Sequence, residues 1–471
     1  MSNYNFGMIG LGVMGRNFLL NIADNGFAVL GLDNDAEKAA ALEQEGNPEQ
    51  VKGVTDRQEF VQQLEKPRKI MMLVPAGDPV DAVIEQIIPL LSEGDVLIDG
   101  GNSHFTDTDR RYAALAVKGV NYMGIGVSGG EKGARFGPSL MPGGTEEAWQ
   151  QVQPILEAAA AKVDGSPCVT YLGPRSAGNY VKMVHNGIEY AIMQLIAEAY
   201  DIMKRGLGMS NAELHHTFSR WNEGPLQSFL IEITGDIFAK TDDAGEGDLI
   251  DKVLDTAKQK GTGKWTSQHA LDLGTPLNAI DVAVSMRYLS ARKGERQMAE
   301  KLLPYQQPVM QENKNAVVSQ LENALYCSFV TAYAQGYALL QSASEAMGYN
   351  LNLAEIARIW RGGCIIRARM LEDFMNAFTK RPQLPNLLTD AHLSNEILTR
   401  QNDWRGIAQF AVLYGIPAAG LLNSLTYYDA YRSGRLPSNL VQAQRDYFGA
   451  HTYERTDKEG IFHSQWGNPE Q

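Results

Sequence analysis

The sequence has few cysteines, no excess of positive charge and no long apolar run. Its three cysteines, Cys168, Cys327 and Cys364, lie far apart and form no CxxC pair, so neither a disulfide framework nor a cysteine-rich metal site is indicated. With 42 basic and 55 acidic residues, the net charge of −13 argues against a nucleic-acid or anionic-membrane partner. No apolar run is long enough to span a bilayer. An anionic substrate would therefore need a local basic cluster.

The N-terminal stretch MSNYNFGMIGLGVMG also lacks the basic segment and apolar core of a signal peptide, so we expect a cytoplasmic protein. At 471 residues the chain is too long for a single core, and two or three domains are expected.

Short apolar runs alternate with amphipathic helical stretches up to about residue 175. These runs are NFGMIG, FAVLGL, KIMMLV, DVLIDG, VNYMGIG and CVTYLG. The alternation predicts a mostly parallel sheet covered by helices. Glycine or small polar residues follow several runs, as in GLGVMG, VPAGD, GGNS and GVSGG, and open α/β sheets bind ligands at that edge. We expect these loops to share one crevice.

The chain changes character at about Gly178, where long helical segments begin. AEAY, AEL and WNEG between 197 and 224 recur as AQGY, AEI and WRGG between 334 and 363. Chance similarity of alanine-rich helices would also give such matches, but their order and spacing favour a duplicated helical unit. The segment after Pro437 has too few apolar residues to fold alone and must dock on its own chain or another. The predicted domains are therefore 1–177 (α/β), 178–436 (all-α, with the duplication) and 437–471 (a C-terminal tail).

Gly10, Gly12 and Gly15 form a GxGxxG pattern between the first expected strand and a helix, and Asp33 follows near the end of the next strand. In such a turn the first two glycines allow a tight, close backbone approach, and the third lets helix and strand pack. The helix N-terminus attracts a pyrophosphate. The first domain is therefore predicted to be a Rossmann-like dinucleotide-binding domain.

Lys182, His185, Asn186 and Glu189 are spaced to lie on one face of a helix. The same spacing also suits a solvated polar face with surface ion pairs, and the residues alone leave both interpretations open. Candidates for a basic cluster are Lys260 and Arg287, although each could simply be a surface residue. In the tail, Arg445 and His451 flank aromatic residues. The glycine-rich stretch GVSGGEKGARFGPSLMPGG, from Gly126 to Gly144, would let a small ligand reach backbone N–H groups.

These motifs together resemble the decarboxylating, long-chain 6-phosphogluconate dehydrogenase family. The resemblance rests on the glycine fingerprint, IDGGNS, GVSGGEKGARFGPSLMPGG, VKMVHNGIEY, QKGTGKWT and RDYFGAHTYE, and covers nearly the whole chain. It implies oxidation and decarboxylation of 6-phospho-D-gluconate to D-ribulose 5-phosphate and CO2, a pentose phosphate pathway step, without a metal ion. It also implies a homodimer in which each tail reaches the neighbouring active site.

The resemblance implies that Lys182 is the base at the C3 hydroxyl and Glu189 the acid that later protonates C1. It implies that the substrate is held by Asn102, Ser128, Gly129, Gly130, His185, Asn186, Tyr190, Lys260, Arg287, Arg445 and His451. The implied cofactor residues are Gly10, Gly12, Val13, Met14, Gly15, Asp33, Asn34, Asp35, Val74, Ala76 and Asn102.

The stretch after the second expected strand bears on the choice of cofactor. NADP-dependent members of the family typically have Asn-Arg-Ser or Asn-Arg-Thr here, whereas this chain has Asp33, Asn34 and Asp35. A carboxylate suits a free ribose 2′-hydroxyl and repels a 2′-phosphate, so NAD is predicted to be preferred. Asp35 could instead simply cap the next helix, and Lys38 could support NADP use.

Two other functions fit parts of the sequence. A different β-hydroxyacid dehydrogenase would share the sheet and the first helical unit but would not need the duplicated unit, Lys260, Arg287 or the tail. A non-catalytic dinucleotide sensor would have no use for Lys182 and Glu189 on one face. The full set of motifs favours the phosphorylated sugar acid.

Overall fold

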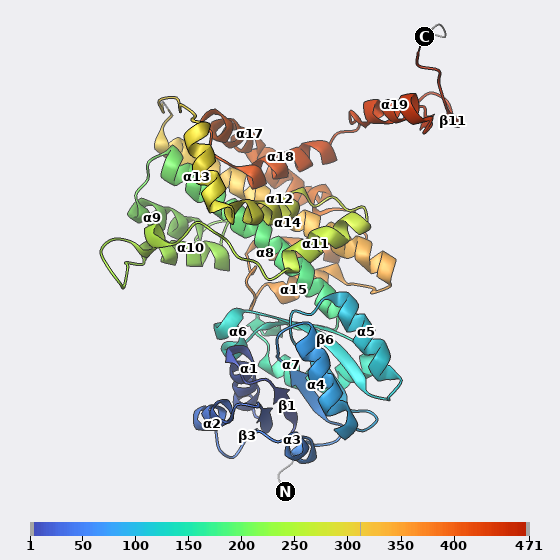
Figure 1. Ribbon diagram of the computed structural model, residues 1–471. Coiled ribbons are helices and arrows are strands. Elements are labelled where there is room, and N and C mark those ends of the chain that lie inside the picture. Colours follow the sequence, from blue (N-terminus) through green and yellow to red (C-terminus); the bar gives the residue numbers. More distant parts are fainter. Residues whose placement is uncertain (1–3, 311, 468–471) are drawn as a thin grey trace. The chain divides into compact units, whose positions relative to one another are not determined.

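Figure 1 shows the computed structural model, which describes residues 4–310 and 312–467. The chain forms two compact units, Met1–Ser424 and Leu425–Gln471, and each is described by itself. The predicted domain ranges, 1–177, 178–436 and 437–471, stay predictions, and their terminal residues 1–3 and 468–471 lie outside the described residues. None of the described helices is long and apolar enough to cross a membrane.

The first part of the larger unit is built on one seven-stranded sheet. Its strand order is β3-β2-β1-β4-β5-β6-β7, and every neighbouring pair is parallel except β6 and β7. The strands are β1 (Phe6–Ile9), β2 (Val29–Leu32), β3 (Val51–Val54), β4 (Lys69–Met72), β5 (Val96–Asp99), β6 (Asn121–Ser128) and β7 (Ser139–Gly143). The predicted Rossmann-like, mostly parallel sheet is confirmed.

Helices cover both faces of this sheet, as Figure 1 shows. Alternate strand residues point to opposite faces, so Met71 and Ile98 join one buried cluster while Ile70 and Leu97 join the other. The first cluster includes side chains of α1 (Val13–Asp24), α2 (Ala36–Glu45), α6 (Gly130–Phe136) and α7 (Glu146–Ala159). The second includes side chains of α3 (Arg57–Gln63), α4 (Asp78–Ile87) and α5 (Phe105–Ala116).

Three sequence-based strand assignments need correction. CVTYLG adds no strand to the sheet, because its only ladder contact is an isolated bridge between Val169 and Leu140. β3 and β7 were not predicted. β3 is a short edge strand that contains a lysine and a glycine, and β7 contains proline and glycine, so neither has the usual composition of a strand. A short antiparallel hairpin precedes the helical region, and its strands β8 (Lys162–Val163) and β9 (Ser166–Pro167) have two residues each.

The rest of the larger unit is helical, which confirms the predicted all-α part. Its helices are α8 (Ala177–Asp201), α9 (Asn211–Trp221), α10 (Phe229–Ala239), α11 (Thr262–Asp272), α12 (Asn278–Ser290), α13 (Lys293–Leu302), α14 (Lys314–Met347), α15 (Leu353–Trp360), α16 (Met370–Lys380), α17 (Ala391–Leu413) and the start of α18 (Ala419–Tyr431). The long helices α8 and α14 pack together, and each is followed by two short helices. An antiparallel bridge between Ser228 and Ala368 joins the corresponding turns of the two series.

The smaller unit is organised around one buried carboxylate. It contains α19 (Ser438–Gly449) and a hairpin of β10 (Tyr453–Glu454) and β11 (Ile461–Phe462). Asp446, on α19, is fully buried and accepts hydrogen bonds from the backbone N–H groups of Thr452 and Ser464 and from the side chains of His463 and Trp466. These bonds lower the pKa of Asp446. One side chain thus ties the helix to the segments that follow it.

Candidate active site

The glycine-rich turn after β1 has the geometry of a dinucleotide site. Gly10 has a φ of +95°, and an added Cβ there would lie 2.6 Å from the carbonyl oxygen of Leu73. A Cβ at Gly15 would lie 1.9 Å from the carbonyl oxygen of Gly10. A Cβ at Gly12, just before α1, would meet nothing within 4 Å. The N-terminus of α1 is therefore open to an anion, and these residues fit a pyrophosphate.

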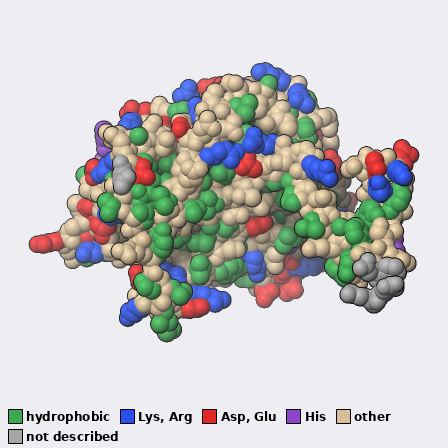
Figure 2. All heavy atoms as spheres, turned by 90° about the horizontal axis from the view of Figure 1, so that it is seen from above, with side chains coloured by type: hydrophobic (Ala, Val, Ile, Leu, Met, Phe, Trp, Pro, Cys, Tyr) green, Lys and Arg blue, Asp and Glu red, His purple; other side chains and the backbone are tan. Residues whose placement is uncertain are grey.

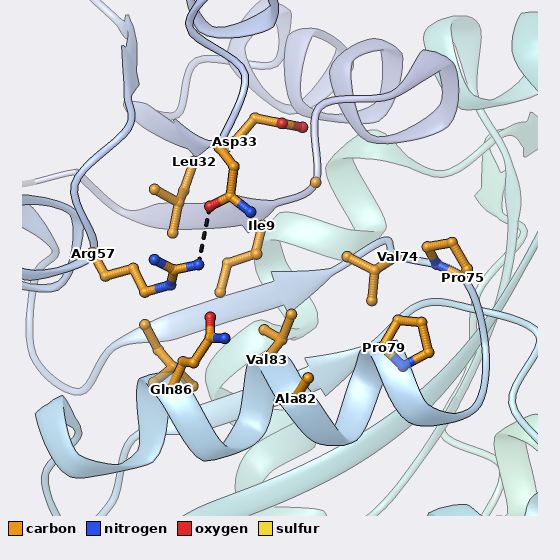
Figure 3. Close-up of a pocket in the computed structure, with 13 residues that line it drawn as sticks. Ile9, Leu32, Asp33, Arg57, Val74, Pro75, Pro79, Ala82, Val83 and Gln86 are labelled. Carbon is orange, nitrogen blue, oxygen red and sulfur yellow. Dashed lines mark hydrogen bonds between the residues drawn. The ribbon is translucent and has the colours of Figure 1, made fainter.

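A cavity of 310 Å³ lies at the carboxyl ends of β1, β2 and β4 (Figure 3). Its volume suits a small ligand. Most of its wall is apolar, and polar side chains stand at the end of β2. The lining residues are Ile9, Gly10, Leu32, Asp33, Asn34, Arg57, Val74, Pro75, Pro79, Ala82, Val83, Gln86 and Ile87. Three predicted cofactor residues besides Gly10 thus share one cavity: Asp33, Asn34 and Val74.

Asp33 is held by the backbone around it. Its carboxylate accepts hydrogen bonds from the N–H groups of Leu11, at 2.8 Å, and Asp35, at 3.0 Å. Asp35 in turn caps α2 by accepting from the N–H of Glu37, as the capping alternative predicted. The ammonium of Lys38 lies 3.8 Å from a carboxylate oxygen of each aspartate. Asp33, whose side chain is 13% exposed, is therefore the fixed acid at the end of β2.

The other predicted cofactor residues lie in the first turn of α1 and in the loops that follow β4 and β5. Val13 and Met14 form the first turn of α1, and Ala76 lies in the loop after β4, the strand next to β1. Asn102 lies in the loop after β5, where the buried Asp99 accepts hydrogen bonds from Gly101 N–H and the Ser103 hydroxyl. Sequence reasoning did not identify the role of Asp99 in shaping this loop, although the motif IDGGNS contains it.

Glycines on β6 bring α8 against the sheet. A Cβ at Gly126 would lie 2.4 Å from Cβ of Lys182, and one at Gly124 would lie 1.8 Å from the side-chain oxygen of Asn179. β6 ends at Ser128, and the two residues that follow it, Gly129 and Gly130, both have positive φ. The close packing places Lys182 next to the same sheet edge as the glycine-rich loop.

Lys182, His185, Asn186 and Glu189 form a stripe along α8 that is largely buried. The alternative interpretation of these residues as a solvated polar face is therefore wrong. Lys182 is 6% exposed, His185 is fully buried and the Glu189 side chain is 21% exposed. Burial lowers the pKa of Lys182, although the nearby Glu189 opposes the shift. Burial raises the pKa of Glu189, against the effects of Lys182 and Arg287. Both shifts favour the uncharged forms: a lysine that can accept a proton and a glutamic acid that can donate one.

His185 links the stripe to the glycine-rich loop. Its Nε2 lies 3.2 Å from Ser128 Oγ and its Nδ1 lies 3.1 Å from Asn186 Oδ1. Burial, together with Lys182, holds the pKa of His185 well below its usual range, so the ring is neutral. The ring packs edge-on against Trp360, and Ile365 N–H donates to Ser128 Oγ at 3.4 Å. Sequence reasoning missed this contribution of residues 360–365, whose only signal was the repeated WRGG.

Two of the predicted substrate-binding residues, Tyr190 and Arg287, are in contact. The guanidinium of Arg287 lies 3.5 Å from the centre of the Tyr190 ring, and it donates to the carbonyl oxygen of Lys258. Lys260 lies exposed two residues further on. Arg445 and His451 belong to the smaller unit, where Arg445 bonds Gln442. In the described residues no group of three or more His, Cys, Asp or Glu side chains is placed to hold a metal ion.

Family comparisons fit this arrangement. Residues 5–173 match the NAD binding domain of 6-phosphogluconate dehydrogenase, and residues 178–466 match the C-terminal domain of the same enzyme. The chain belongs to the 6-phosphogluconate dehydrogenase family. The family predicted from the sequence motifs is thus confirmed, and the first part of the chain is an NAD(P)-binding domain.

Individual members of the 6-phosphogluconate dehydrogenase family are similar along almost the whole chain. The NADP(+)-dependent, decarboxylating enzyme of Bacillus subtilis is 52% identical over 99% of this chain and 100% of its own. The decarboxylating enzyme of Synechococcus elongatus is also 52% identical, with the same coverage. The Plasmodium falciparum enzyme, solved with NADP+ and with 6-phosphogluconate, superposes with a TM-score of 0.95 at 45% identity, over 98% of this chain and 100% of that one.

Proposed function

We propose that this chain oxidises and decarboxylates 6-phospho-D-gluconate to D-ribulose 5-phosphate and CO2. The observation that carries the proposal is the stripe on α8, with Lys182 and His185 buried and Glu189 mostly so, which packs on a sheet that also carries a dinucleotide-binding turn. The bound nicotinamide dinucleotide supplies the hydride acceptor. The names of the similar enzymes, which are decarboxylating, support the same reaction.

Lys182 acts first, as the base at the C3 hydroxyl. Its lowered pKa increases the fraction of the amine that is neutral and can accept a proton. Lys182 takes the hydroxyl proton while the hydride leaves C3. The product is a β-keto acid, which can lose CO2 when charge builds on the C3 oxygen. The protonated Lys182 donates to that oxygen, so no metal ion is needed at this step.

Glu189 acts last, as the acid that protonates C1 of the enediol. Its raised pKa keeps a fraction of the carboxyl protonated, and its place two helical turns beyond Lys182 puts base and acid along one substrate. Asn102, Ser128, Gly129, Gly130, His185 and Asn186 hold the carboxylate and hydroxyls of the sugar acid. Tyr190, Lys260 and Arg287 hold the phosphate.

The tail completes the phosphate site in a homodimer, where Arg445 and His451 of one protomer serve the active site of its partner. In this arrangement the first domain (1–177) binds the cofactor and the helical domain (178–436) binds the substrate. The tail (437–471) reaches the neighbouring protomer. The exposed apolar side chains of α19 support a protein partner: Leu440, Val441, Tyr447 and Phe448 are 56–73% exposed.

A substrate scan tests the reaction. Purified protein should reduce cofactor with 6-phosphogluconate far faster than with gluconate or with small β-hydroxy acids such as 3-hydroxyisobutyrate. An equal or higher kcat/KM for an unphosphorylated acid would favour a different β-hydroxyacid dehydrogenase. Cofactor binding without turnover of any acid would favour a sensor.

NAD is the preferred cofactor in this proposal. Asp33 is fixed at the end of β2 by two backbone N–H groups, where it can accept a hydrogen bond from a ribose 2′-hydroxyl. At about 5 Å and an effective dielectric constant near 20, a phosphate charge beside it costs about 3 kcal/mol. After partial screening by solvent and by Lys38, a remaining ~2 kcal/mol gives roughly thirtyfold discrimination. Asp35 is engaged in capping α2, so most of the discrimination against NADP is expected to come from Asp33.

The similar proteins include the NADP(+)-dependent enzyme of Bacillus subtilis and the Plasmodium falciparum enzyme solved with NADP+, so the proposed preference sets this chain apart from them. The test is the ratio of kcat/KM for NAD and NADP at saturating 6-phosphogluconate. The wild-type ratio should favour NAD, and the triple change Asp33→Asn, Asn34→Arg and Asp35→Ser should shift it toward NADP. A wild-type ratio that favours NADP contradicts the preference.

A further inference from the structure

An arginine enters the cofactor cavity from an element that the glycine fingerprint does not include. Arg57 is the first residue of α3, and its half-buried side chain lines the cavity together with Asp33 and Asn34. Its Nη2 donates a hydrogen bond to Asn34 Oδ1 at 3.0 Å. Figure 3 shows this side chain reaching in from beside Leu32, while Val83 and Gln86 reach in from α4. The motifs of the sequence give Arg57 no role.

The cavity around Arg57 suits a flat, uncharged ring. Its other walls are the apolar side chains of Ile9, Val74, Pro79 and Val83. A planar guanidinium packs face to face on aromatic rings and is attracted to their π electrons. Among the described residues Arg57 has no ion-pair partner, and its one hydrogen bond to Asn34 leaves the face of the guanidinium free.

The placement of the charges separates Arg57 from the 2′ end of a bound nucleotide. The Asp33 carboxylate points to the glycine-rich turn, where it accepts from Leu11 N–H. The cation beside Asp33 and Asp35 is Lys38, at 3.8 Å from each. Arg57 is instead held by Asn34 inside the cavity. A 2′-phosphate would therefore meet Asp33 and Lys38 first.

We propose that Arg57 stacks on the adenine ring of the cofactor, with Asn34 holding the guanidinium in place. Because adenine is common to NAD and NADP, Arg57 strengthens the binding of both equally and takes no part in the choice between them. This inference rests on the proposed function only in that a nicotinamide dinucleotide occupies the cavity.

The test compares Arg57→Ala and Arg57→Lys with wild type and with Lys118→Ala, which removes an exposed charge of the same domain. Calorimetry gives Kd for AMP and for 2′,5′-ADP, which differ at the 2′ position, and steady-state kinetics give kcat and KM for NAD and NADP. Arg57→Ala should weaken both nucleotides and raise both KM values about tenfold, with kcat unchanged. Arg57→Lys should recover little, because an ammonium has no flat face. Lys118→Ala should match wild type.

A loss confined to 2′,5′-ADP and NADP, and recovered by lysine, would show that Arg57 is a 2′-phosphate ligand and overturn the proposal. Unchanged binding of both nucleotides in Arg57→Ala would overturn it as well. A wild-type enzyme that prefers NADP contradicts the NAD preference but leaves the equal effect of Arg57 intact. A wild-type protein that binds neither nucleotide overturns the cofactor site itself.

Discussion

In the proposed mechanism Lys182 is uncharged when it takes the hydroxyl proton, and its burial on α8 favours the uncharged form by lowering its pKa. Lys182→Met removes the base but keeps an apolar chain of similar length, so the protein should fold and bind cofactor. Cofactor reduction should fall by roughly 10²- to 10⁴-fold or more. The control is Lys264→Met, which changes an exposed lysine of α11. Substantial turnover by Lys182→Met would show that another group takes the proton.

Glu189, the acid of the proposed mechanism, also affects Lys182 through its charge. The carboxylate raises the pKa of Lys182, so Glu189→Gln should lower that pKa further. Oxidation requires neutral lysine, and its rate falls as the pH drops below the lysine pKa. In Glu189→Gln this acid limb of single-turnover hydride transfer should therefore move to lower pH, while steady-state turnover falls more than hydride transfer. A limb that stays in place or moves to higher pH would contradict the coupling.

The sequence predicted some site residues and missed others for physical reasons. Lys182, His185 and Glu189 are spaced three and four residues apart, as on one face of a helix, so their common face could be predicted from the sequence. The contacts of Asp99 and Arg57 follow no regular spacing in the sequence, so they could not be predicted. Asp99 fixes the loop before Asn102, and Arg57 reaches Asn34 from α3. Burial decided between the two interpretations of the α8 stripe, because helical spacing does not reveal which face meets solvent.

At the scale of elements, the contact between β6 and α8 positions Lys182 at the edge of the sheet. A methyl group at Gly126 would overlap the side chain of Lys182, so Gly126→Ala should displace α8. The overlap should lower the free energy of unfolding by about 1 to 3 kcal/mol and reduce kcat more than cofactor affinity. Gly294→Ala, where an added Cβ meets nothing within 4 Å on helix α13, should lower neither the free energy of unfolding nor kcat. Thermal melts and kinetics measure both effects, and a neutral Gly126→Ala would refute tight packing.

The buried strands of the parallel sheet could be predicted because each is a short apolar run. β3 and β7 could not, because their pairing depends on neighbouring strands rather than on composition: β3 lines up with β2 at the edge, and β7 runs antiparallel to β6. The CVTYLG run failed for the opposite reason. It is apolar because Cys168 and Val169 are buried, yet only Val169 makes a ladder contact.

At the scale of the whole molecule, the smaller unit is expected to serve the neighbouring protomer. A variant that lacks residues 445–471 should lose affinity for 6-phosphogluconate, because it lacks Arg445 and His451. Mixing it with Lys182→Met should restore activity, because a mixed dimer can combine an intact Lys182 with an intact tail. The mixture is compared with each variant alone after denaturation and refolding. No recovery in a preparation shown to contain mixed dimers would mean that each tail serves its own chain.

The most direct measurement is the stoichiometry of CO2 and reduced cofactor formed from 6-phosphogluconate by the purified enzyme, with and without EDTA. A buried lysine that acts as base and then as proton donor should yield one CO2 for each reduced cofactor, with ribulose 5-phosphate as the sugar product, and EDTA should not change the rate. Reduced cofactor without CO2, or activity lost on chelation, would contradict the assignment of Lys182 to both steps.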